Sequence, residues 1–252
     1  MSEAFLQLEN VRKVYRTRGD DFLAVSDVTM DVGEGELVAL VGPSGCGKTT
    51  VLRILAGLHR HDGGTVRIGG GDFDPGRDIG IVFQQALLLK WRRILDNVLL
   101  PAEILGLPMK AARERARALL DMVGLQGFEQ KYPYELSGGM QQRAAIARAL
   151  IHDPKLILMD EPFGALDALT RERMNLELLG IWADSHKTIV FVTHSIQEAV
   201  FLGSHCAVLT AGPARMADYF AIDLPYPRRL DVKTTPTFGQ YTQRIYRLLG
   251  ME

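Results

Sequence analysis

Long apolar runs are absent from this sequence, and the absence limits how the protein can meet a membrane. No stretch of the 252 residues approaches the roughly 20 uninterrupted apolar residues that a spanning helix needs. The first residues, MSEAFLQLE, also lack the basic segment and the continuous apolar segment of a signal peptide. We therefore expect that the chain does not cross a membrane, and that any membrane association comes through a partner.

Cysteine and net charge are also scarce. Cys46 and Cys206 are the two cysteines, which is too few for a disulfide framework and fits a cytosolic, reducing compartment. The chain carries 29 Lys and Arg against 30 Asp and Glu, a formal net charge of -1. A balanced charge gives no global attraction to nucleic acid, so we expect no nucleic-acid partner. The length favours one large α/β domain covering residues 1–252.

The most informative stretch is GPSGCGKTT at residues 42–50, which matches G-x-x-x-x-G-K-[ST]. It follows the apolar run 36–41 and precedes a segment at 50–56 with helical spacing, so the order is strand, loop, helix. Such a loop surrounds a polyphosphate with backbone N–H groups at a helix N-terminus. We predict that Lys48 reaches the β- and γ-phosphates, that Thr49 binds Mg²⁺ and that Thr50 holds the α- and β-phosphates. The predicted binding loop comprises Gly42, Pro43, Ser44, Gly45, Cys46, Gly47, Lys48, Thr49 and Thr50.

Cys46 is interpreted as an ordinary small residue of this loop. Its thiol still allows a test, because alkylation there should block ATP binding unless bound nucleotide protects it.

The segments flanking the loop predict a β-rich N-terminal part. Alternating apolar and polar residues at 5–11, 23–30 and 36–41 indicate strands joined by polar turns such as 18–21 and 33–35. Further turns and a short strand follow at 63–71. Tyr15, after the first strand, either stacks on a nucleotide base or packs at a sheet edge. Gln84, after an apolar strand at 78–83, either ligates Mg²⁺ or is an ordinary loop residue.

Residues 86–150 lose the β pattern and become rich in Leu, Ala, Arg and Glu, which indicates a helical insertion. Residues 109–124 form an amphipathic helix that Gly124 ends, and the arginines there indicate a solvated face. Its apolar face holds Ala112, Ala116, Leu119, Leu120 and Val123. In LSGGMQQR at 136–143, Ser137 can cap the next helix, and Gly138 and Gly139 leave its first N–H groups uncovered. This indicates either a second anion site or a simple capped helix.

Two further apolar strands end in groups suited to catalysis. Residues 155–162 end in Asp160 and Glu161, and the continuous apolar run indicates a strand covered on both faces. Asp160 is predicted to support Mg²⁺ and Glu161 to take a proton from water. A helix is expected at 170–182, and a strand at 188–193 ends in His194, which either contacts a γ-phosphate or is a loop residue. Residues 206–210 are expected to be the last strand, before a tail with a short terminal helix.

Taken together, these motifs resemble the ATP-binding subunits of ABC transporters over nearly the whole chain. The resemblance rests on GPSGCGKTT at 42–50, Gln84, LSGGMQQR at 136–143, LILMDEP at 156–162, ALD at 165–167 and His194. It implies a mainly parallel core sheet with an N-terminal antiparallel β part (1–85 and 151–215), a helical subdomain at about 86–150 and a tail at 216–252. It also implies ATP and Mg²⁺ as cofactors.

The same resemblance implies roles that spacing left open. Two copies would face each other head to tail, with Ser137, Gly138 and Gly139 of one closing over the γ-phosphate held by Lys48 of the other. Tyr15 would stack on adenine, and Gln84 would couple Mg²⁺ and nucleotide to the helical subdomain. Asp167 would communicate across the dimer, and His194 would be the switch histidine.

Within the family, the segments at 91–107 and 162–173 and the tail resemble importers of nitrate, sulfonate, taurine and related nutrients. This implies ATP-driven import through a separate membrane permease docking near 85–105, at the cytoplasmic face of the inner membrane, with a solute-binding protein as indirect partner. The chain departs from many such relatives, since Lys90 precedes Trp91 where they have proline and Ser195 follows His194 where they have an acidic residue. These departures leave the solute open.

Three other functions are considered beside ATP-driven import. A P-loop kinase for a small acceptor shares the phosphate loop but gives no reason for LSGGMQQR or His194. A soluble ABC-type ATPase needs a long coiled coil or a second cassette, and the chain has neither sustained heptads nor a second motif set. An exporter subunit needs a separate membrane chain, which the sequence does not exclude.

Overall fold

The computed structural model describes residues 4–16, 19–69, 72–164 and 166–251. Four expectations touch the remaining positions: the turn beginning at Arg18, the glycine turn at Gly70 and Gly71, Ala165 of the ALD motif, and Glu252 at the end of the tail. Those positions lie outside the described residues.

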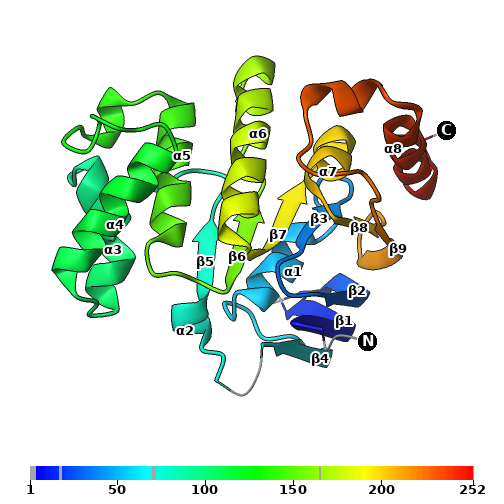
Figure 1. The fold of residues 1–252 in the computed structure, drawn as a ribbon. Helices are drawn as coiled ribbons and strands as arrows, with labels where there is room; N and C mark the ends of the chain where they lie inside the picture. Colours follow the sequence, from blue (N-terminus) through cyan, green and yellow to red (C-terminus); the bar gives the residue numbers. More distant parts are fainter. Residues whose placement is uncertain (1–3, 17–18, 70–71, 165, 252) are drawn as a thin grey trace.

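One nine-stranded sheet of order β4-β1-β2-β9-β8-β3-β7-β6-β5 runs through the molecule (Figure 1). The strands are β1 (Leu6–Arg16), β2 (Asp21–Val32), β3 (Leu37–Val41), β4 (Gly63–Ile68), β5 (Ile79–Val82), β6 (Leu156–Asp160), β7 (Thr188–Thr193), β8 (His205–Leu209) and β9 (Ala214–Ala221). Strand pairs β5/β6, β6/β7, β7/β3 and β3/β8 are parallel, whereas β1/β2, β1/β4 and β8/β9 are antiparallel. The expected parallel core with an antiparallel N-terminal part is confirmed.

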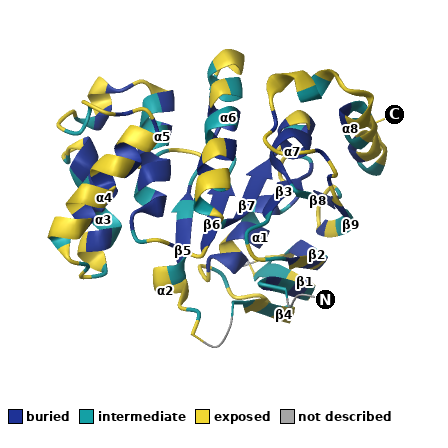
Figure 2. Ribbon diagram, in the orientation of Figure 1, coloured by how far each residue is buried: buried dark blue, intermediate teal, exposed yellow. Residues whose placement is uncertain are grey.

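Central strands are apolar at consecutive positions because helices cover both faces of the sheet. In β3, Leu37 and Val41 belong to one buried cluster, while Val38 and Leu40 belong to the other. This alternation follows from the twofold period of a strand. Figure 2 shows these strands as the most buried part of the chain. The carboxyl ends of β3, β6 and β7 therefore lie side by side at one edge, where ligands bind in such sheets.

Helices surround this sheet and form a separate group at one end (Figure 1). They are α1 (Lys48–Leu55), α2 (Pro75–Asp78), α3 (Ile94–Ile104), α4 (Met109–Met122), α5 (Gly138–Leu150), α6 (Ala168–Ser185), α7 (Ile196–Leu202), α8 (Pro236–Leu248) and the 3₁₀ turns η1 (Pro133–Glu135) and η2 (Leu230–Thr234). Helices α3, α4 and α5 pack on one another as the predicted helical insertion. The apolar face predicted for α4 is buried, and Gly124 follows the helix at a φ of 67°.

Two expected boundaries were wrong. Residues 206–210 are not the last strand, because β9 follows and joins the parallel core to the antiparallel part through β8 and β2. Strand β9 was not recognised from the sequence, because its polar and apolar residues do not alternate regularly and its burial is uneven along the strand. Helix α6 begins at Ala168, two residues before Thr170, because Asp167 caps it. The predicted terminal helix is present as α8. Within the described residues, no helix is long and apolar enough to cross a bilayer.

Candidate functional site

The phosphate loop joins β3 to α1, as predicted. Gly47 precedes α1 with a φ of 114°, no side chain caps the helix, and its first turn holds no acidic residue. The uncapped N–H groups and the positive end of the helix therefore favour an anion. A pocket of about 310 Å³ lies here, lined by Ser44, Gly45, Gly47, Lys48, Thr49, Thr50 and Glu161.

Lys48 is buried beneath the loop with 4% of its surface exposed. Its Nζ donates to the carbonyl oxygens of Gly42 at 2.8 Å and Pro43 at 2.9 Å, and lies 3.9 Å from Glu161 Oε1. These oxygens compensate the ammonium group for lost hydration. The Lys48 ammonium group thus lies between the loop and the Glu161 carboxylate, and Lys48 lines the pocket at the phosphate loop.

Glycine is required in the loop for steric reasons at two positions. A Cβ on Gly47 would lie 2.7 Å from the carbonyl oxygen of Ala24, and one on Gly42 would lie 2.7 Å from that of Leu209. Cys46 instead turns its side chain into the core, with only 1% exposed, and burial raises the pKa of its thiol. A thiol in this state alkylates slowly, so the predicted protection by nucleotide needs long labelling times.

Thr49 and Asp160 come together from α1 and β6. Thr49 Oγ1 donates to Asp160 Oδ1 at 3.0 Å. Burial raises the pKa of the Asp160 carboxyl, while the Thr49 hydrogen bond opposes that rise. A hydroxyl and a carboxylate side by side at a phosphate loop are oxygen ligands of the kind Mg²⁺ takes together with phosphates. The described residues contain no cluster of three or more His, Cys, Asp or Glu side chains that could hold a metal by themselves.

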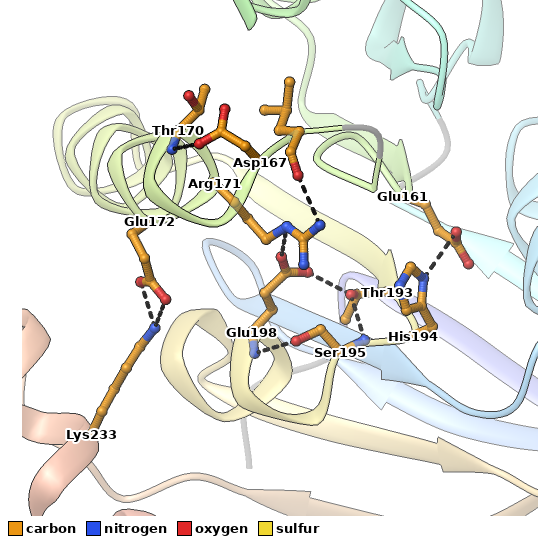
Figure 3. A network of polar contacts seen from close by, with 11 residues as sticks. Glu161, Asp167, Thr170, Arg171, Glu172, Thr193, His194, Ser195, Glu198 and Lys233 are labelled. Atoms are coloured by element: carbon orange, nitrogen blue, oxygen red, sulfur yellow. Dashed lines mark hydrogen bonds and ion pairs between the residues drawn. The ribbon is translucent and has the colours of Figure 1, made fainter.

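Glu161 lies at the centre of the candidate catalytic groups. It follows β6 with a φ of 45°, a conformation that non-glycine residues adopt at a cost of about 1–2 kcal/mol. Its Oε2 lies 3.2 Å from His194 Nδ1 (Figure 3). The same oxygen lies 3.5 Å from Gln84 Nε2. The strained backbone thus directs one carboxylate toward Lys48, His194 and Gln84.

Gln84 contacts Glu161 and not the pair of Thr49 and Asp160. Its place as a metal ligand therefore stays a prediction.

Tyr15 lines a second pocket of about 410 Å³ beside α1. Its hydroxyl lies 3.0 Å from His59 Nδ1 and 3.4 Å from Thr50 Oγ1, and its ring meets the His59 ring edge to face. The aromatic ring is thus adjacent to the phosphate loop, where a base attached to the phosphates would lie. Both stacking on adenine and simple packing remain compatible with this position.

The predicted signature residues lie elsewhere. Ser137 caps α5 by accepting from the Met140 N–H at 3.3 Å, as predicted. Gly138 lines a pocket with Gln84, Gln85 and Leu166, and none of Ser137, Gly138 and Gly139 lines the pocket around Lys48. The chain alone therefore does not place them on the phosphates. Asp167 caps α6, and its hydrogen bonds with Thr170 lower the pKa of its carboxyl.

The residues that hold the segment after Gln84 were not predicted from the sequence. Gln142 Nε2 donates to the Phe83 carbonyl at 3.0 Å, and Arg148 donates to those of Ala86 and Leu87 at 2.7 and 2.8 Å. Asn97, fully buried, bonds Leu89 through both its amide nitrogen and oxygen. Polar residues on otherwise buried helix faces were the available signal.

Comparisons with known proteins agree with this geometry. The family profile described as "ABC transporter" matches residues 25–164. An uncharacterised ABC transporter ATP-binding protein of Methanocaldococcus jannaschii is 47% identical, covering 98% of this chain and 92% of the relative. A taurine import ATP-binding protein of Pelagibacter ubique is 41% identical over 96% of this chain and 93% of its own. A dimeric ATP-binding cassette bound to ADP and Pi superposes with a TM-score of 0.75 at 34% identity, covering 87% of this chain and 100% of the cassette.

Proposed function

The chain belongs to the ABC transporter family, and from this premise we propose that it is the ATP-hydrolysing subunit of an importer for a small solute. The observation that carries the proposal is the meeting of Lys48, Thr49, Asp160 and Glu161 at one edge of the sheet. The taurine import relative supports a small, anionic or zwitterionic nutrient as the solute.

The residues divide the chemistry among them. The uncapped N-terminus of α1 and Lys48 bind the phosphates, and the Tyr15 ring stacks on the adenine. Thr49 and Asp160, with Gln84, would hold Mg²⁺, which would neutralise charge on the phosphates. Glu161 orients a water and accepts its proton, and His194, 3.2 Å from Glu161, keeps that carboxylate aimed at the reacting phosphate.

A second copy completes the site in this proposal. Ser137, Gly138 and Gly139 do not reach the phosphate loop within one chain, and the ADP-bound cassette it resembles is a dimer. A phosphate bound between two copies stabilises the closed dimer, and hydrolysis removes that stabilisation. Opening and closing would then drive the membrane partner.

Replacing Glu161 tests the hydrolytic step. Glu161→Gln should lower kcat for ATP at least about 100-fold, the scale of general-base catalysis, while ATP binding persists and the dimer stays closed. The readouts are phosphate release and nucleotide-dependent dimerisation. Phosphate release at the parent rate would refute the role of Glu161. Glu172→Gln, at a half-buried α6 position whose carboxylate pairs with Lys233 and not with the site, is the matched control.

The surface for the permease is proposed between the helical group and the core. A hollow of about 350 Å³ is lined by Ile81, Phe83, Leu87, Leu100, Pro101 and Ile104, within or next to the predicted segment 85–105. Leu87 and Ile104 are exposed, so an apolar helix of the partner would bury them. The segment after Gln84, which Gln142 and Arg148 hold through hydrogen bonds, connects this hollow to Glu161.

Purification from detergent-solubilised native membranes tests the importer proposal and its placement at the cytoplasmic face of the inner membrane. A polytopic membrane protein with a solute-binding protein should copurify, and the bound ligand would name the solute. Recovery with soluble partners alone would favour a soluble ATPase instead. A membrane partner without a solute-binding protein would favour an exporter.

A further inference from the structure

A ring of contacts begins and ends at Glu161 and includes two side chains, Arg171 and Glu198, that the proposed reaction does not use. Figure 3 shows the side-chain part of this ring. On one side, Glu161 contacts His194, whose neighbour Ser195 donates its N–H to Thr193 Oγ1 at 3.0 Å. On the other side, the Gly164 N–H donates to the Glu161 carbonyl and the Leu166 N–H donates to the Phe163 carbonyl. These two segments leave neighbouring strands β7 and β6.

Arg171 and Glu198 join the two sides behind the site. Arg171 Nη2 donates to the Leu166 carbonyl at 2.9 Å, and its Nε lies 3.6 Å from Glu198 Oε1. The other oxygen of Glu198 accepts from Thr193 Oγ1 at 2.6 Å. One pair of side chains thus connects the start of α6 with the turn that carries His194.

The ion pair between Arg171 and Glu198 differs from an ordinary surface ion pair, because its carboxylate is shielded from solvent. Glu198 is only 7% exposed, and burial raises the pKa of its carboxyl against the opposing effects of Thr193 and Arg171. Arg171 Nε is buried and has no hydrogen-bond partner, so the Glu198 carboxylate at 3.6 Å is the charge that faces it. The Arg171 side chain is 31% exposed, so this half-buried pair adds little net stability, and its effect is to fix the distance between the two segments.

We propose that Arg171 and Glu198 are positioning residues that hold Glu161 and His194 at their contact distance by fixing the two segments past the edge of the sheet. The backbone pairing of β6 and β7 ends with Asp160 opposite Val192 and the bond from Glu161 N to Val192 O. Beyond that point the backbone hydrogen bonds of the sheet no longer fix the distance between the segments that follow β6 and β7. Contacts between side chains then fix that distance. This inference rests on the proposed function, because it concerns the same hydrolytic site.

Kinetics of single and double variants test the pair. Arg171→Met should lower kcat for ATP about tenfold and leave the Kd for ATP within about twofold, since neither residue of the pair binds the phosphates in this proposal. Glu198→Gln should have a similar effect. The double variant should be no worse than the poorer single variant, because both remove one connection. Glu172→Gln breaks only the ion pair with Lys233 and should keep the parent kcat.

Two kinetic outcomes would overturn the proposal. Losses that multiply in the double variant would show that the residues act separately. A weaker Kd for ATP with unchanged kcat would place Arg171 in nucleotide binding, since it lines a pocket with Ser44 and His194.

Amide exchange tests the connection without relying on activity. In the full chain, Arg171→Met should make the Ser195 amide exchange about tenfold faster, although the substitution lies on another element. Glu172→Gln should leave that amide unchanged, and equal exchange in all three proteins would overturn the inference. A parent chain that neither binds nor hydrolyses ATP would refute the proposed function, and amide exchange alone would then decide whether the pair connects the segments.

Discussion

At the scale of single residues, the site depends on side chains held in unfavourable surroundings by specific partners. Lys48 is buried against two carbonyl oxygens, and the half-buried Asp160 accepts from one hydroxyl. Glu161 adopts a positive φ. Each of these arrangements costs free energy, and contacts with the edge of the sheet and with α1 maintain it. Such unfavourable local arrangements are concentrated at binding and catalytic sites.

His152 lies away from this site and predicts a pH dependence of folding. Its Nε2 lies 3.1 Å from the Ile79 carbonyl, its Nδ1 is buried without a hydrogen-bond partner, and burial lowers the pKa of the ring. As the pH falls below about 6.5, the usual pKa of histidine, the unfolded chain binds a proton before the folded one. Folded stability attributable to His152 is therefore complete above that pH and declines below it.

We expect His152→Gln to lose less stability than the parent between pH 7.5 and 5.5. Urea unfolding midpoints at the two pH values measure this difference. Equal losses in both proteins would assign the acid sensitivity to other groups. His61→Gln, on an exposed turn, is the matched control.

At the scale of elements, the tail is anchored to α7 by Arg228 together with Tyr226, whose hydroxyl donates to the Leu202 carbonyl at 2.8 Å. Arg228 is 3% exposed and its Nη1 donates to the carbonyls of Val200, Phe201 and Gly203 at 2.9–3.0 Å. Its guanidinium also lies 4.0 Å from the centre of the Tyr226 ring. A cation at the C-terminus of a helix satisfies carbonyls that the helix leaves open.

Arg228→Met should destabilise the fold by about 2–4 kcal/mol, because several buried carbonyls lose their donor. Arg229→Met, at the exposed neighbouring position, should change stability by less than about 0.5 kcal/mol. Guanidinium unfolding measures both. Similar free energies of unfolding for the two variants would show that the carbonyls find other partners.

At the scale of the whole molecule, the two halves of the proposed site lie in different copies. Lys48→Ala and Gly138→Asp chains should each be inactive as homodimers. A mixed dimer contains one site in which both Lys48 and Gly138 are intact, so it should have about half the activity of a parent dimer if the two sites act independently. Because random pairing at equal amounts makes about half of the dimers mixed, the mixture should recover about a quarter of the parent activity. Steady-state phosphate release across mixing ratios measures this.

The mixture experiment has its own control and its own refutation. Gly138 has open space around it, so Gly138→Ala should fold normally and isolates the effect of added bulk at the partner contact. No recovery on mixing, with mixed dimers shown to form, would contradict a shared site.

Local chemistry was sufficient to predict the phosphate loop, the strand ending in Asp160 and Glu161, and the capped helix after Ser137. In each, a glycine pattern, an apolar run or a capping residue acts within a few residues along the chain. The apolar face of α4 was predictable for the same reason. Strand β9 was not predictable in this way, because its burial is uneven along the strand. The start of α6 at Ala168 does follow a local signal, the Asp167 cap, and the expected start at Thr170 overlooked it.

The tertiary structure alone decided which side chains meet. Thr49 reaches Asp160 across 111 positions, and Arg171 meets Glu198 only because α6 and α7 follow neighbouring strands. It also separated the signature residues from the phosphate loop. Sequence patterns determine elements because hydrogen bonding and periodicity are local, whereas contact between elements depends on strand order, which no single segment encodes.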